Sequence, residues 1–116
     1  MPADAFNVLA VGNMEDRDTI SRADDRITDS SRTGPATTSN GEYRVKPDIA
    51  APGTEIISCY FDWENNEDWA IMSGTSMAAP HGAGAAALIM DAGLTSSLEA
   101  RILMMNTAIC ARVMLL

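Results

Sequence analysis

The sequence has few residues of the kinds that bind metals or build disulfide frameworks. Its 116 residues include one histidine, His81, and two cysteines, Cys59 and Cys110. Two cysteines define no framework; they can pair, but free buried thiols are the favoured interpretation. Without a second cluster of cysteine or histidine, no zinc site is expected. The aspartate-rich stretch 15–25 lacks the spacing and the glycine of a calcium loop, so it is interpreted as a solvated loop.

Basic residues and long apolar runs are also scarce. Eight lysines and arginines stand against sixteen aspartates and glutamates, which gives a formal net charge of -8. An acidic surface repels nucleic acid and anionic lipid, so neither is an expected partner. No stretch approaches the roughly 18 uninterrupted apolar residues of a membrane-spanning helix. The first twelve residues lack a basic region followed by an apolar core, so they do not have the pattern of a signal peptide.

The length suits one small domain that contains both strands and helices. Residues 6–12 are an apolar run without alternation, which predicts a buried and parallel strand. Residues 13–46 are polar and predict a surface loop, with a short strand at 41–45. Two further strands are expected at 54–59 and 69–72, joined by a hairpin-like excursion around residues 65–66. No internal repeat is visible.

Residues 75–92 form the main predicted helix, which ends at a glycine. This segment has almost no polar face, so it is expected to be buried on all sides. Gly82 and Gly84 each cost about 1 kcal/mol relative to alanine in a helix interior, and close packing against a neighbour should compensate. A helix buried all round needs layers that the rest of the sequence does not supply. The chain is therefore predicted to be part of a larger domain.

A second helix is predicted within residues 95–107, where Ser96 or Ser97 can cap its start. Leu98, Ile102 and Met105 fall on one side of this helix. The last eight residues are apolar and show no clear ending.

Ser76 lies between a glycine-containing entry and the main predicted helix. Gly74 permits tight backbone geometry, and a helix that begins near Thr75 presents free N–H groups and the positive end of its dipole close to Ser76. An anion that develops on a substrate carbonyl would be stabilised there, as acyl transfer requires. The alternative is a small residue packed in the first helical turn, and spacing alone favours this structural interpretation.

His81 is the one histidine that could activate Ser76. Five residues along a helix give a rotation of about 140° and a rise of about 7.5 Å, so the two side chains point to different faces. A catalytic base must lie within about 3 Å of the hydroxyl. His81 is therefore predicted to be a packed, hydrogen-bonded residue, and the sequence holds no other histidine that could serve as the base.

The stretch GTSMAAPHGAG, residues 74–84, resembles the segment around the catalytic serine of subtilisin-like serine proteases, the subtilases; only Gly82 departs, at a valine position. Four other stretches resemble the family in the same order along the chain. KPDIAAPG is similar to its Lys-Pro-Asp-x-x-Ala-Pro-Gly segment, and DSSRTGP to its Ser-Ser-Arg-Gly-Pro loop with Thr33 inserted. NVLAVG is similar to a family strand and ILMMNTA to a helix end. Together the five matches cover residues 7–108.

The resemblance implies a fold class, α/β with a mostly parallel sheet in three layers, present here only as a partial domain. It implies that Ser76 is the nucleophile of a serine endopeptidase, with its own N–H in the oxyanion hole, and that His81 is not catalytic. In this family the catalytic Asp and His and an oxyanion Asn precede the serine segment, and nothing in residues 1–69 resembles their motifs. Residues 1–116 are thus expected to be the C-terminal third of a peptidase domain, with 109–116 as a divergent end.

The resemblance also bears on ligands and location. A peptide or protein is the expected substrate, and the missing N-terminal part of the domain is the expected partner. No cofactor is visible in the sequence, while a complete family domain can bind calcium. Many subtilases are secreted, so a location outside the cell is consistent with the family.

Other functions are weighed against this one. Residues 82–87 satisfy the dinucleotide-binding pattern G-x-G-x-x-A, but Pro80 and His81 stand where that fingerprint needs a strand. The hydrolase elbow G-x-S-x-G fails because Ala78 occupies the second glycine position. The main alternative is a catalytically incomplete fragment or pseudoenzyme with a binding or structural role, because the triad Asp and His are missing from this sequence.

Overall fold

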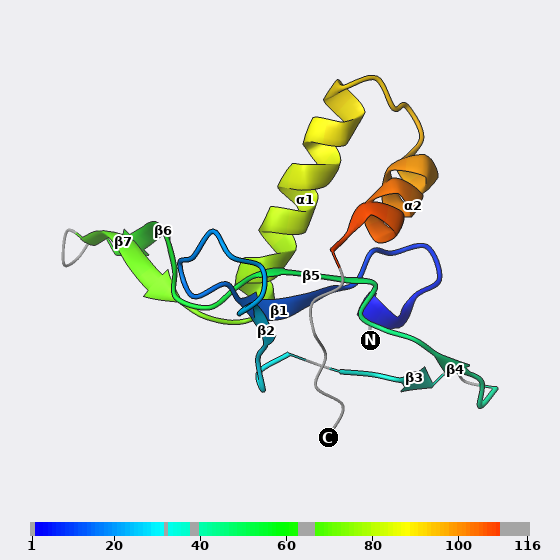
Figure 1. The fold of residues 1–116 in the computed structure, drawn as a ribbon, viewed down its shortest axis with the longest axis horizontal. Coiled ribbons are helices and arrows are strands. Elements are labelled where there is room, and N and C mark those ends of the chain that lie inside the picture. The colour runs from blue at the N-terminus through cyan, green and yellow to red at the C-terminus, as the bar shows by residue number, and fades with distance from the viewer. Residues whose placement is uncertain (1, 32, 38–39, 63–66, 110–116) are drawn as a thin grey trace.

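The computed structural model describes residues 2–31, 33–37, 40–62 and 67–109. Its main sheet has three strands in the order β2-β1-β5 (Figure 1). β1 (Val11–Glu15) pairs in parallel with β5 (Ile49–Pro52) and antiparallel with β2 (Arg26–Ile27). The fold is therefore mixed α/β with a partly parallel sheet, as predicted.

Two antiparallel pairs stand beside this sheet. β3 (Ala36–Thr37) pairs with β4 (Tyr43–Arg44), and β6 (Ile56–Asp62) pairs with β7 (Glu67–Met72). The ribbon of β6 and β7 extends away from the helices at one end of the molecule (Figure 1). A short 3-10 helix, η1 (Pro2–Asp4), opens the chain.

Two α-helices complete the fold. α1 (Thr75–Asp91) packs against β1 and β5, and α2 (Ser97–Thr107) lies beside it (Figure 1). The Oγ of Ser96 accepts a hydrogen bond from the amide of Glu99 and caps α2, as predicted. No helix in the described part of the chain is long and apolar enough to cross a membrane.

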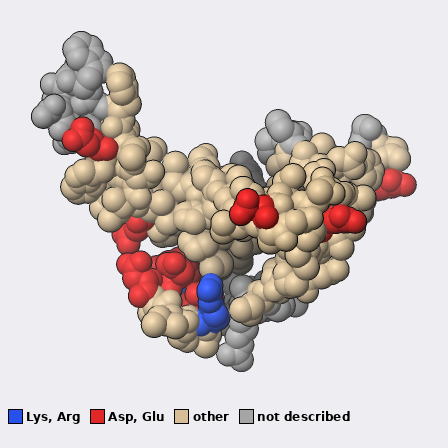
Figure 2. All heavy atoms as spheres, turned by 90° about the horizontal axis from the view of Figure 1, so that it is seen from above, with Lys and Arg blue, Asp and Glu red and all other residues tan. Residues whose placement is uncertain are grey.

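The apolar core is thin. Among the described residues only six apolar ones are buried, and four of them are alanines, so these side chains remove little apolar surface from water. The six are Ala10, Met14, Ala51, Ala78, Ala100 and Met104. Acidic side chains are spread over the face shown in Figure 2, which carries little lysine or arginine and agrees with the negative net charge.

The predicted strands are largely confirmed, with shifted boundaries. The first strand begins at Val11 instead of Phe6 and continues through Glu15, so the prediction of a surface loop from residue 13 onward is wrong there. Asn13 and Met14 are buried in the sheet, although the predicted strand ended at Gly12. The predicted short strand at 41–45 is confirmed as β4. The hairpin is confirmed, while its predicted turn at 65–66 lies outside the described residues.

The predicted helix over 75–92 is confirmed, but the expectation that it is buried on all sides is wrong. Along α1 only Ala78 and Gly82 are buried, and Leu88 is 73% exposed. The sheet and α2 cover one side of α1, and no layer in the described residues covers the other. In α2 the buried residues are Ala100 and Met104, so the predicted apolar side around Leu98 is exposed.

The glycines of α1 differ in their surroundings. A Cβ added at Gly82 would lie 2.9 Å from Cγ2 of Val11, so the helix approaches β1 closely there, as expected from the sequence. A Cβ added at Gly84 would meet nothing within 4 Å, so no close packing compensates that glycine. Cys59 is a free thiol on the exposed part of β6, against the expectation of a buried one, and Cys110 lies outside the described residues.

Candidate active site at the start of α1

Ser76 is the second residue of α1, and its side chain is exposed to solvent. The preceding Gly74 has φ 146° and ψ 171°, a conformation that side-chain-bearing residues rarely adopt. The chain therefore turns from β7 into α1 over a residue that has to be glycine. This turn places the hydroxyl of Ser76 at the N-terminal end of the helix, where a reactant can reach it.

Two hydrogen bonds fix the turn before Ser76. The amide of Gly74 donates to the carbonyl of Gly53 over 2.7 Å, and the amide of Glu55 donates to Oγ of Ser73 over 2.8 Å. The carbonyl of Gly74 accepts from the amides of Met77 and Ala78 and starts the helix. The residues that follow β5 thus hold the first turn of α1 in place.

The first amides of α1 suit an oxyanion. Those of Thr75 and Ser76 precede the first helical hydrogen bond, and helix geometry gives them no partner within the helix. They stand at the positive end of the helix dipole. Negative charge that develops on an oxygen close to Ser76 would be stabilised there, which is the electrostatic requirement of acyl transfer.

His81 is not positioned to act as the base for Ser76. Its Nδ1 lies 2.9 Å from the carbonyl oxygen of Met77, one turn earlier in the same helix. Because a carbonyl only accepts, Nδ1 carries the proton in this bond. The predicted hydrogen bond is confirmed, but the side chain is exposed and not packed. Because His81 is the one histidine of the sequence, this chain places no imidazole on Ser76.

Sequence reasoning missed two residues beneath the site. Gly53 touches the turn directly, because a Cβ added there would lie 2.7 Å from the carbonyl oxygen of Gly74 and 2.9 Å from Cβ of Ala78. Asn13 is buried below Gly53, with its Oδ1 2.5 Å from the same added Cβ. The glycine after Pro52 was a visible signal for a close approach. Nothing in the sequence marked Asn13, which followed the apolar run.

A charged cluster centred on Asp48 joins α2 to the sheet. The Asp48 carboxylate is 2.6 Å from Nζ of Lys46 and 3.3 Å from Nη2 of Arg101, and it accepts from the amide of Ala10 over 2.7 Å. Burial raises the pKa of Asp48, but these partners together, Lys46 foremost, hold the pKa below its ordinary value. The carboxylate, whose side chain is 4% exposed, therefore stays ionised and structural.

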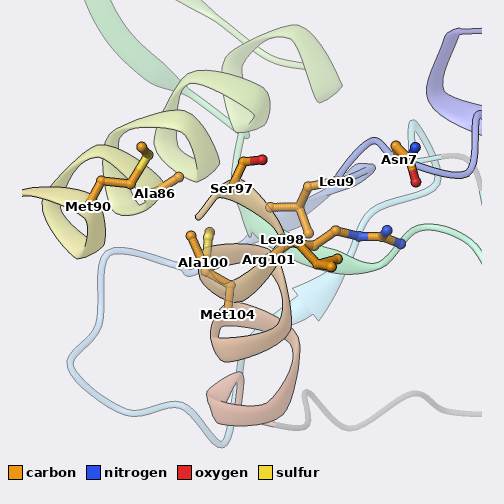
Figure 3. Close-up of a pocket in the computed structure, with 9 residues that line it drawn as sticks. All are labelled: Asn7, Leu9, Ala86, Met90, Ser97, Leu98, Ala100, Arg101 and Met104. Carbon is orange, nitrogen blue, oxygen red and sulfur yellow. The ribbon is translucent and has the colours of Figure 1, made fainter. Parts of the chain in front are cut away.

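A cleft of about 420 Å³ lies between α1, α2 and the segment before β1. It lies along the part of α1 that carries Ala86 and Met90 (Figure 3). This part is near the end of the helix, whereas Ser76 is its second residue. Its lining residues include neither Ser76 nor the turn before it, so the cleft is separate from the site at Ser76. No group of acidic, histidine or cysteine side chains in the described residues could hold a metal ion.

Comparison with known proteins identifies the family to which the chain is similar. The model of the Subtilase family matches residues 1–113. The serine protease AprX of Bacillus subtilis (strain 168) is 38% identical over 100 residues, which cover 78% of this chain and 22% of AprX. The minor extracellular protease Vpr of the same strain is 38% identical over 95 residues, which cover 78% of this chain and 11% of Vpr.

A third relative is the subtilisin of Bacillus sp. (strain TA39), 37% identical over 91 residues, which cover 76% of this chain and 20% of that protein. The chain thus spans about a fifth or less of the length of these three relatives. Because the match to AprX covers 78% of the chain, it includes Ser76 wherever it begins.

Proposed function

The chain belongs to the subtilase family, and from that premise we propose that it forms the serine-bearing part of a serine endopeptidase with Ser76 as its nucleophile. The observation that carries this proposal is the position of Ser76. Its hydroxyl is exposed at the start of α1, beside helix amides that have no partner within the helix. A buried serine in the first turn, the structural alternative, would have no access to a substrate.

The reaction follows from that position. Oγ of Ser76 attacks the carbonyl carbon of the scissile peptide bond, and its proton passes to a histidine base. The carbonyl oxygen becomes an oxyanion, and the N–H of Ser76 donates a hydrogen bond to it. The C–N bond then breaks, the amine leaves with the proton from the histidine, and water hydrolyses the acyl-enzyme.

The histidine comes from outside these 116 residues in this proposal. His81 is bonded to its own helix, and no second histidine exists in the sequence. Without a base, the Ser76 hydroxyl is a poor nucleophile, and loss of the histidine in subtilisin reduces turnover about 10⁶-fold. We therefore propose that residues 1–116 act as the C-terminal third of a peptidase domain, with 109–116 as a divergent end. Residues that precede it in such a domain supply the Asp, the His and an oxyanion Asn.

Substrate, calcium and location are proposed on the same premise. The substrate is an extended peptide or protein segment. The backbone of such a segment can pair with strands of the enzyme, which gives affinity whatever side chains the substrate carries. Calcium would be held by other parts of a complete domain, since the described residues group no set of ligands for it. A location outside the cell is supported by the relative Vpr, whose name describes it as extracellular.

A second candidate function is a binding or structural role without catalysis. The observation that favours it is the missing base: within this sequence, no histidine reaches Ser76. This candidate predicts that Ser76 remains unreactive even when a histidine and an aspartate are supplied in the geometry of a working relative.

A chimera separates the two candidates. Residues 1–113 of this chain, which match the family model, replace the corresponding segment of AprX. A fluorophosphonate probe, which reacts with activated serines, is then applied to the chimera, to its Ser76→Ala variant and to the chain alone. The proposal predicts that the chimera is labelled and that neither its Ser76→Ala variant nor the chain alone is labelled. The His81→Gln chimera is the matched control and should label like the parent chimera, because the His81 ring is hydrogen-bonded to the Met77 carbonyl of its own helix and not to Ser76.

A further inference from the structure

Asn13 is a fully buried amide in the middle of the sheet. Its exposure is 0%, and no larger side chain in the described residues is buried as completely. Its Nδ2 donates to Oγ of Ser30 over 2.8 Å, and its Oδ1 accepts from Oγ1 of Thr54 over 3.4 Å. Its backbone amide donates to Oγ of Ser31 over 3.0 Å. The side chain therefore joins β1 to the loop after β2 and to the residue that follows Gly53.

The side chain of Asn13 also lies against Gly53. A Cβ added at Gly53 would lie 2.5 Å from Oδ1 of Asn13 and 2.7 Å from the carbonyl oxygen of Gly74. Gly53 thus lies close to both the Asn13 amide and the turn that begins α1. Since the Gly74 amide donates to the Gly53 carbonyl, any shift of Gly53 is passed on to the residue two positions before Ser76.

We propose that Asn13 is a positioning residue for Ser76, which it sets through Gly53 and Gly74 without touching the substrate. This inference rests on the proposed role of Ser76 as nucleophile. A buried amide with both of its ends hydrogen-bonded has one orientation. Together with the bond that the Gly53 amide donates to the Met14 carbonyl over 3.0 Å, it limits where Gly53 can lie. An alanine at this position would leave a void under Gly53 and remove the partners of Ser30 and Thr54.

The effect on catalysis follows from the geometry of attack. A nucleophile displaced by about 1 Å by a change outside the reacting groups can lose about 100-fold in rate. Asn13→Ala should therefore lower kcat of the chimera about 10- to 100-fold, while KM changes less than about threefold. The small change in KM is expected because no substrate contact is removed.

The control is a residue of similar burial at a distance from the site. Met104 is buried on α2 and lines the cleft between the helices, away from Ser76. Met104→Ala removes core packing, so it should lower Tm while kcat stays within about twofold of the parent. Equal losses of kcat in the Asn13→Ala and Met104→Ala variants at equal losses of Tm would overturn the proposal, because they would show a general effect of stability.

A second readout needs no turnover. In the full chain, exchange of the Gly74 amide with solvent deuterium reports its bond to Gly53. Asn13→Ala should speed this exchange at least about tenfold relative to amides of α2, and Met104→Ala should not. Unchanged Gly74 exchange together with unchanged kcat in Asn13→Ala would refute the role of Asn13. An unlabelled parent chimera would count against the proposed function, and Gly74 exchange would then decide on Asn13 alone.

Discussion

The carbonyl of Gly53 accepts a hydrogen bond from the amide of Gly74 over 2.7 Å. This bond joins the end of β5 to the turn that begins α1, although the two residues are far apart in the sequence. It ties the N-cap of α1, two residues before Ser76, to the residue that follows β5. Gly53 can make this approach because it has no Cβ, and Gly74 can turn the chain because its φ is 146°.

A side chain at Gly53 should disturb this junction. In Gly53→Ala, the new methyl group would lie within 2.9 Å of three atoms, so backbone segments must move apart. We expect a loss of about 1–3 kcal/mol in the free energy of unfolding of the AprX chimera, as for other overpacked sites. Labelling of Ser76 by the fluorophosphonate should slow as well. A Gly53→Ala variant with the Tm and labelling rate of the parent would show that the contact between Gly53 and Gly74 accommodates a methyl group.

The two glycines of α1 form a matched pair. In the chain of 116 residues, Gly82→Ala places a methyl group 2.9 Å from Val11 and should destabilise the protein, since the gain in helix propensity is smaller than the cost of the clash. Gly84→Ala meets nothing within 4 Å and should stabilise it by up to about 1 kcal/mol. Chemical denaturation gives both values. The same sign for both substitutions would contradict the packing assigned to α1.

The charged cluster predicts a pH dependence of stability. The pKa of Asp48 is lowered in the folded chain, so its stabilising effect is present above the ordinary unfolded value of about 3.9 and is lost as pH falls through the folded pKa. Asp48→Asn should cost about 3 kcal/mol at pH 7, because it leaves two nearby cations without their carboxylate.

The difference between the parent and Asp48→Asn should begin to narrow below about pH 4, where the carboxylate of the unfolded parent takes up a proton, and should narrow further as pH falls through the lower pKa of the folded chain. Urea unfolding of both proteins between pH 7 and pH 3 tests this, since acid effects elsewhere cancel in the difference. A difference that stays constant across this range would show that Asp48 does not titrate with folding.

The sequence predicted those features that depend on local patterns. α1, α2 with its Ser96 cap, and the pair of β6 and β7 follow from apolar runs, capping residues and glycine stops. The close approach of α1 to β1 at Gly82 was also predicted, because a glycine inside a helix is destabilising unless close packing compensates for it. The family assignment came from five motifs in order and was confirmed by the family model.

Features that depend on distant contacts were not predicted. β1 extends past Gly12 because β5 pairs with it as far as Met14, and an apolar run cannot reveal that partner. Asn13 is polar yet buried, since Ser30 and Thr54 satisfy its amide, and these partners lie far along the chain. The prediction that α1 is buried on all sides was wrong because it rested on the apolar composition of the helix alone. How much of the helix is buried depends on which neighbouring layers are present, and composition does not give these.

The central claim is that Ser76 is a nucleophile whose histidine base comes from outside these 116 residues. The most direct test is the rate of fluorophosphonate labelling in the chimera of residues 1–113 with AprX, with the labelled residue identified by mass spectrometry. The account predicts stoichiometric labelling at Ser76, abolished by Ser76→Ala and absent from the chain alone. A folded chimera that remains unlabelled, or a chain that labels Ser76 without any added polypeptide, would contradict it.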